Sequence, residues 1–120
     1  MQTLEQRRAQ DAWNRCAHYK KDHVNLAKGL PALIMNSGLM QVMAFLQEKG
    51  CKPSQRHCDD LAKDLRAWLH ERFRDVPESF EGFMEAMLKG DSRKYQAVTT
   101  EAFAWLNWMR QMSAARIGGE

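Results

Sequence analysis

Three side chains that could ligate a metal occur close together in the middle of the sequence. Cys51, His57 and Cys58 are residue types that bind zinc. Structural zinc sites usually combine two closely spaced ligand pairs, and this group does not have that spacing. We therefore expect neither a metal nor a cofactor.

No recognisable catalytic motif is present either. The sequence lacks the G-x-S-x-G nucleophile motif, a phosphate-binding glycine loop and the H-E-x-x-H zinc motif. Asp59 and Asp60 form a carboxylate pair, but they stand near the start of an expected helix, where negative charge interacts favourably with the helix dipole. The sequence thus predicts a protein that is not an enzyme.

The overall composition predicts one globular domain. The chain has 120 residues, of which 44% are hydrophobic and 28% are charged, which is ordinary for a folded domain. The N-terminal segment MQTLEQRRAQDAWNRC is charged and lacks the apolar core of a signal peptide. We therefore expect a single domain over residues 1–120 and a cytoplasmic location, in which the three cysteines remain reduced.

The spacing of apolar residues predicts helices throughout the chain and no sheet. A long first helix is expected over residues 3–28, closed by Gly29, and a second unit over residues 31–50, opened by Pro31 and interrupted at residues 36–38. A third begins near Ser54 and stops before Pro77. A short helix opened by a capping box at residues 75–78 ends at residue 89, and a last one, capped by Asp91 or Ser92, covers residues 92–117. This pattern predicts an all-α, compact single-domain bundle of about five to six helices.

Residues 27–50 form an unusually apolar stretch. A membrane span needs about 20 apolar residues, and this stretch is interrupted by polar residues at positions 36, 37 and 41. We therefore expect no membrane association and interpret the stretch mainly as core. Leu33, Phe45 and Leu106 are predicted to be buried, whereas the four histidines are predicted to lie at the surface: His18, His23, His57 and His70.

Charge is distributed unevenly along the chain. Residues 1–58 hold nine Lys or Arg against four Asp or Glu, residues 59–91 hold five against nine, and residues 92–120 hold four against two. The overall net charge is only +3. The basic front and rear suggest one surface that faces a polyanion, although such charge runs often mean only a solvated face.

Three segments, in this order, resemble one known family. They are residues 12–50, with K-x-L-P-x-L-I and N-x-G-L; residues 61–69, LAKDLRAWL; and residues 94–112, with Tyr before T-x-E-A and a Trp-rich end. Together they are similar to the small helical subunit of the type III-B CRISPR effector, the Cmr complex. The similarity runs across most of the chain.

The resemblance implies a non-catalytic subunit in antiviral defence. It would stack in more than one copy along a filament of other effector subunits and help to hold target RNA paired to the CRISPR RNA. Base pairing supplies sequence specificity in such complexes, so protein cations need only contact the RNA backbone. The basic residues expected to do so are Arg15, Lys20, Lys21, Lys28, Lys49, Lys52, Arg93, Lys94 and Arg110.

Trp108 is the candidate for a contact with a partner subunit, because it lies off the main apolar stripe of the last helix. Burial in the core is the more common place for a tryptophan. Two other functions remain open. One is a free-standing helical adaptor that binds proteins through an apolar face rich in Met and Trp, and the weaker one is a DNA-binding helical domain.

Overall fold

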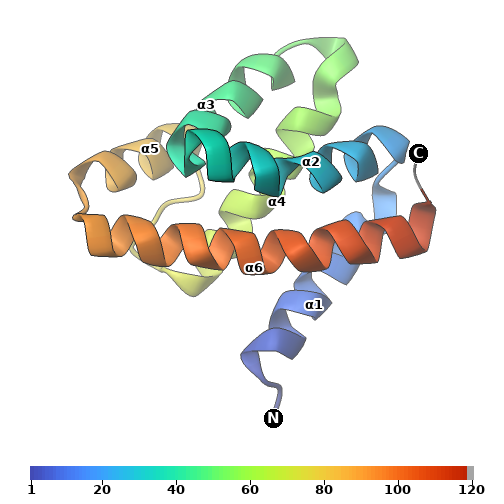
Figure 1. Ribbon diagram of the computed structural model, residues 1–120, viewed down its shortest axis with the longest axis horizontal. Helices are drawn as coiled ribbons and strands as arrows, with labels where there is room; N and C mark the ends of the chain where they lie inside the picture. The colour runs from blue at the N-terminus through green and yellow to red at the C-terminus, as the bar shows by residue number, and fades with distance from the viewer. Residues whose placement is uncertain (119–120) are drawn as a thin grey trace.

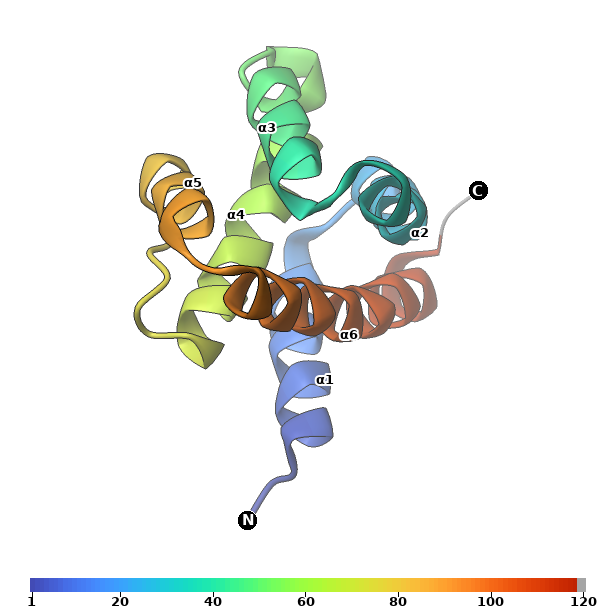
Figure 2. The ribbon, with the colours of Figure 1, turned by 60° about the vertical axis from the view of Figure 1, so that its left-hand side comes forward.

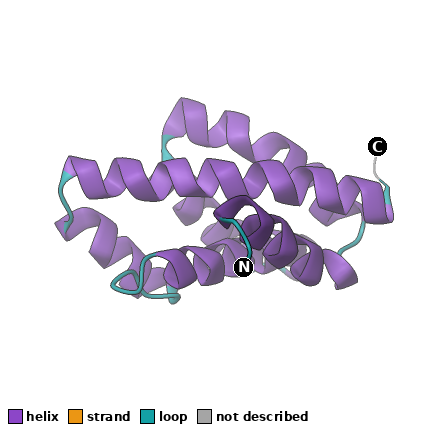
Figure 3. Cartoon of the chain, turned by 90° about the horizontal axis from the view of Figure 1, so that it is seen from below, coloured by secondary structure: helices purple, strands orange, loops and turns teal. Residues whose placement is uncertain are grey.

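The computed structural model describes residues 1–118 of the chain (Figure 1). Over these residues six α-helices and two short 3₁₀ helices follow one another, and no strand is present (Figure 3). The predicted all-α bundle of five to six helices is confirmed. The elements are α1 (Leu4–Arg15), η1 (Cys16–His18), α2 (Lys21–Ser37), α3 (Leu39–Gly50), η2 (Pro53–Gln55), α4 (Arg56–Arg72), α5 (Phe80–Lys89) and α6 (Ser92–Ile117).

The longest helix, α6, is the central element of the bundle. It packs against α1, α2 and α4 (Figures 1 and 2). Its side chains Val98, Ala102, Trp105, Leu106 and Met109 are fully buried. Helix α4 packs in turn against α3, and α5 lies beside α3 on the side of α4 away from α2 (Figure 2). The core therefore lies between α6 and the layer formed by α2, α3 and α4.

The predicted first helix over residues 3–28 is wrong, because the chain leaves the helical conformation between α1 and α2. Tyr19 and Lys20 are extended, with ψ of 156° and −179°. The Tyr19 side chain is buried and its hydroxyl donates to Asp64 of α4. Burial of this ring against another helix explains a break that the sequence periodicity does not show.

The second boundary is also displaced. Gly29 and Pro31 both lie inside α2 and do not separate two helices. The break predicted within residues 36–38 is confirmed and falls at Gly38, whose φ of 88° is a left-handed value that favours glycine. The Tyr95 hydroxyl lies here and accepts a hydrogen bond from the Met40 N–H at the start of α3. Two of the motifs noted in the sequence, N-x-G-L and the Tyr before T-x-E-A, thus meet in space.

The helix caps agree only in part with the sequence pattern. Asp91, one of the two residues expected to cap α6, does so by accepting from the Lys94 N–H. The capping box predicted at Asp75 is wrong, because α5 begins later, at Phe80, and Ser79 caps it by accepting from the Gly82 N–H. Asp75 instead forms an ion pair with Lys94 at 2.8 Å.

Burial of the apolar stretch is less complete than predicted. Leu106 is fully buried, as expected, but Leu33 and Phe45 are 40% and 42% exposed, so their predicted burial is wrong. Both lie on the outer side of α2 and α3, where they line a small surface pocket with Val42. Among the described residues, no helix has the length and apolar character that a membrane crossing needs.

The prediction of four surface histidines is also only partly right. His18 is exposed, whereas His57 and His70 are half-buried. His23 is only 7% exposed, which contradicts its predicted place at the surface. It stacks on Tyr19, with ring centroids 4.4 Å apart, so the break before α2 draws both rings into the bundle.

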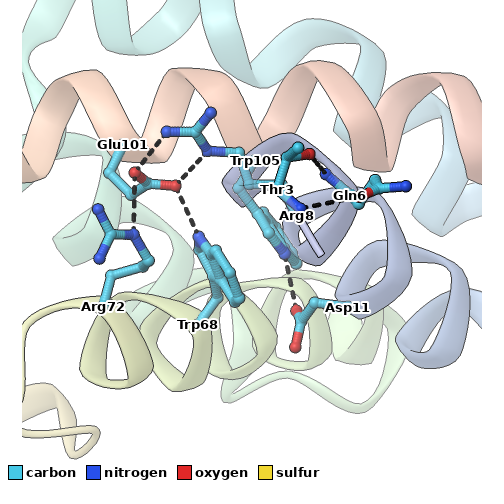
Figure 4. Close-up of polar contacts among 8 residues, drawn as sticks. All are labelled: Thr3, Gln6, Arg8, Asp11, Trp68, Arg72, Glu101 and Trp105. Atoms are coloured by element: carbon cyan, nitrogen blue, oxygen red, sulfur yellow. Dashed lines mark hydrogen bonds and ion pairs between the residues drawn. The ribbon is translucent and has the colours of Figure 1, made fainter. Parts of the chain in front are cut away.

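A buried carboxylate joins α1, α4 and α6 (Figure 4). Glu101 of α6 is 4% exposed and accepts hydrogen bonds from Arg8 Nε at 2.6 Å and Nη2 at 2.8 Å. It also accepts from Trp68 Nε1 at 3.0 Å and from Arg72 Nε at 3.3 Å. Two cations and an indole N–H therefore compensate one buried charge.

These partners decide the pKa of Glu101. Burial alone would raise the pKa, but the hydrogen bonds from Arg8 and Trp68 and the charges of Arg8 and Arg72 outweigh it and hold the pKa below its usual value of 4.5. The folded state therefore binds this proton less readily than the unfolded chain. The resulting stabilisation is complete above pH 4.5 and is lost as the pH falls through the lower folded-state pKa.

The first prediction compares buried and exposed apolar side chains. Leu106→Ala should lower the free energy of unfolding by about 2–5 kcal/mol, because it leaves a cavity in the core. Leu33→Ala and Phe45→Ala should each cost about 1 kcal/mol, because part of each side chain already contacts water. Urea unfolding followed by circular dichroism measures all three. Equal losses would contradict the described packing.

The second prediction concerns Glu101. Glu101→Gln should lower the free energy of unfolding at pH 7 by about 2–4 kcal/mol, because Arg8 and Arg72 lose their counter-charge. The gap between wild type and variant should shrink as the pH is lowered from 5 to 3. Urea unfolding across this pH series measures it, with Glu71→Gln on the exposed face of α4 as the control. A gap that does not change with pH would rule out the ionic role of Glu101.

Candidate nucleic-acid interface

Most of the exposed basic side chains predicted to contact RNA lie near one end of the molecule. The first half of α2 lies beside the last part of α6, because the two helices run antiparallel (Figure 1). Lys20, Lys21 and Lys28 lie on or just before this half of α2, and Arg110 lies on the last third of α6. All four residues are exposed.

A network of buried and half-buried polar groups holds the start of α2 against α4. The Lys20 N–H donates to His23 Nδ1 at 3.0 Å, so the other ring nitrogen of His23 carries the proton and donates to Asp60 at 2.9 Å. Tyr19, stacked on His23, donates to Asp64. Burial raises the pKa of Asp64, and the Tyr19 hydrogen bond and the Arg15 charge oppose that shift without cancelling it.

This arrangement places the connection between α3 and α4 next to the start of α2. A polar pocket of about 270 Å³ lies between them. Lys20 and Arg56 bring positive charge to its lining, and Asp22 and Asp60 bring negative charge. Lys52 lies immediately before this segment and is exposed. The fold thus adds Lys52 and Arg56 to the cations of α2.

The end of α6 contributes a further cation and an exposed aromatic ring. Arg116 lies over the Trp13 ring, with its guanidinium carbon 4.1 Å from the ring centroid, and donates to the Trp13 carbonyl at 2.9 Å. Trp13 is 41% exposed. Sequence reasoning did not select Trp13, Arg56 or Arg116, since their closeness to the predicted cations depends on the break before α2. We refer to the exposed cations of this region as the basic end: Lys20, Lys21, Lys28, Lys52, Arg56, Arg110 and Arg116.

The predicted RNA-binding residues with intramolecular partners include Arg15, Lys94 and Lys49. Arg15 forms an ion pair with Asp11 at 2.8 Å and lies 3.6 Å from Asp64. It therefore belongs to the polar network that includes Tyr19 and Asp64. Lys94 pairs with Asp75. Lys49 is half-buried, and its ammonium group lies 5.7 Å from the Phe45 ring centroid.

The structure therefore divides the predicted residues among separate regions. Arg93 and Lys94 lie at the start of α6, at the opposite end of that helix from Arg110 (Figure 1). Arg93 is exposed but is not part of the basic end.

Trp108, the predicted partner contact, is half-buried on α6. It lines a shallow groove between α1 and α6 with Arg8 and Asn107. Part of its indole packs on the core, so the residue is neither a fully buried core tryptophan nor a fully exposed one.

The possible zinc ligands lie apart from any suitable cluster. Cys58 is buried and Cys51 is exposed. Over residues 1–118, no group of three or more His, Cys, Asp or Glu side chains is arranged to hold a metal ion.

Comparison with known proteins agrees with the resemblance seen in the sequence. The family described as CRISPR-associated protein (Cas_Cmr5) matches residues 4–116. The chain is also similar to the CRISPR system Cmr subunit Cmr5 of Thermus thermophilus, with 29% identity over 122 residues that cover 98% of each chain. The ordered motifs and the helical fold are thus accounted for by common descent, and the chain belongs to the CRISPR-associated Cas_Cmr5 family.

Proposed function

We propose that this chain is a non-catalytic small subunit of the type III-B CRISPR effector, the Cmr complex. In this role several copies stack along the filament of other subunits and help to hold target RNA paired to the CRISPR RNA. Family membership over residues 4–116 supports the assignment to such a complex. The observation that carries the RNA-binding role is the grouping of exposed cations from α2, α6 and the α3–α4 connection at the basic end.

The chemistry of the basic end suits contacts with an RNA backbone. Lys and Arg side chains bind phosphates irrespective of sequence, and the pairing of guide and target supplies the specificity. Trp13 adds an exposed aromatic ring next to Arg116, and such rings stack on unpaired bases without base preference. A subunit with these groups steadies a bound strand without reading its sequence.

The opposite side of the molecule has the opposite charge. Residues 75–91, which comprise α5 and its flanking loops, hold five Asp or Glu against one Lys; we call this region the acidic side. It would repel an RNA strand, so we assign it to protein contacts, together with the Trp108 groove.

An adaptor without nucleic acid is the second candidate function. It is favoured by the exposed apolar side chains Leu33, Met35 and Phe45 on α2 and α3, of which Met35 is 77% exposed. Such a patch fits a protein partner. Both functions allow protein contacts, and only the first requires RNA contacts at the basic end.

The third prediction tests the RNA contacts. Lys21→Ala, Lys28→Ala and Arg110→Ala combined should weaken the hold of the assembled complex on target RNA. The slope of log affinity against log salt should become shallower by up to about 2, because each lost single-strand phosphate contact accounts for about 0.7. Target-RNA binding measured across a salt series, with circular dichroism to verify the fold, gives both quantities.

A matched control removes the same charge elsewhere. Lys63→Ala, Arg74→Ala and Lys89→Ala are exposed substitutions outside the basic end and should leave the slope unchanged. If both triple variants give the wild-type slope and affinity, the basic end does not contact RNA and the adaptor function is favoured.

A further inference from the structure

A buried arginine on α4 lacks a carboxylate partner. Arg66 is 3% exposed, and no carboxylate of residues 1–118 forms an ion pair with it. Its Nε donates to the Glu78 carbonyl at 2.8 Å, and its Nη1 contacts the Met43 sulfur at 3.4 Å. The guanidinium carbon lies 5.9 Å from the Phe80 ring centroid.

These contacts compensate the charge only in part. A guanidinium carries five N–H donors and stays protonated in proteins. One carbonyl, one weakly accepting sulfur and one ring face leave several of these donors without a strong acceptor. Burial accordingly lowers the pKa of Arg66, while the charge of Asp59 acts in the opposite direction. Asp59 itself is engaged by Lys63, at 3.0 Å.

Arg66 lines a surface pocket of about 640 Å³ between α3, α4 and the start of α5. Phe80 and Glu81, the first two residues of α5, line the same pocket. Their N–H groups have no acceptor within the helix, because the first N–H groups of a helix lack one. The pocket therefore combines a buried cation with the positive end of a helix dipole, which favours an anion.

The surroundings of the pocket decide which anion fits. It opens on the acidic side, and Asp59 and Glu81 belong to its lining. A strand of RNA would bring several negative charges against these carboxylates. A protein segment avoids that repulsion, because it brings only one carboxylate into the pocket. Basic residues beside that carboxylate on the same segment would face Glu81 and attract it.

We propose that this pocket binds a carboxylate side chain of a partner subunit, with Arg66 as its buried anchor. The pocket accepts an Asp or Glu between the guanidinium and the first N–H groups of α5. This inference rests on the proposed function only in that the partner is another subunit of the same complex. Arginines in desolvated interface pockets often carry much of the binding energy.

The fourth prediction measures assembly with Arg66→Met. The affinity of the labelled subunit for the rest of the complex should fall about tenfold or more, because the carboxylate loses its partner. The isolated variant should melt at the wild-type temperature or above, because a methionine next to Met43 removes a buried charge that is only partly compensated. Arg74→Met, at an exposed cation outside this pocket, is the control and should change the affinity less than threefold.

Titration of the isolated subunit tests the pocket without the complex. Sodium acetate should shift the ¹H and ¹⁵N resonances of Phe80 and Glu81 saturably, relative to sodium chloride. Arg66→Met should abolish the shift, and Glu81→Gln should strengthen acetate binding, because it removes a competing carboxylate. An oligouridylate should leave these resonances unchanged.

Three results would overturn the proposal: no saturable acetate shift, the same shift in Arg66→Met, or a shift caused by the oligouridylate instead. With the subunit at saturating concentration, Arg66→Met should keep the wild-type salt slope for target RNA. A failure of this inference is thereby distinguishable from a failure of the RNA-binding role.

Discussion

The burial of Glu101 is the constraint on which the arrangement of the helices depends. A carboxylate inside a helical bundle is tolerated only when cations and hydrogen-bond donors surround it, and Arg8, Trp68 and Arg72 bring these from α1 and α4. Helices α1 and α4 are thereby both fixed to one point of α6. Asp11 repeats the arrangement nearby by accepting from Trp105 (Figure 4). It also accepts a hydrogen bond from Arg15. Polar contacts thus set the crossing of α1 over α6, and apolar packing fills the space around them.

With α6 held in this way, the two charged regions lie on different sides of the molecule. The last third of α6 and the first half of α2 carry the basic end, whereas the start of α6 follows directly on the acidic side. The break at Tyr19 is important here, because it lets α2 turn back along α6 and brings Lys20 next to Arg56. We infer that the basic end contacts RNA, whereas the acidic side binds a partner protein through the Arg66 pocket.

The sequence predicted the class of fold and the family, because helical periodicity and ordered motifs are local properties. It also located the break within residues 36–38 and narrowed the cap of α6 to Asp91 or Ser92, because glycine and a short polar side chain have direct local roles at these places. It missed the break at Tyr19 and the burial of His23, since both depend on contacts with α4, far along the chain. Glu101 and Arg66 resembled ordinary surface residues in the sequence. Among the RNA-binding candidates, Lys94 could not be recognised as ion-paired, because Asp75 reaches it only through the fold. The pair between Arg15 and Asp11 is different, since the two residues are four apart on one helix and their spacing is visible in the sequence.

The central claim is that the basic end faces RNA in the assembled complex. Ultraviolet crosslinking of the complex to a uridine-containing target, followed by mass spectrometry of the crosslinked peptides, tests it most directly. We expect crosslinks on this subunit in the peptides around Trp13, residues 20–28 and residues 110–116, and none in residues 75–91. Crosslinks concentrated on α5, or no crosslinks to this subunit when neighbouring subunits give them, would contradict the account.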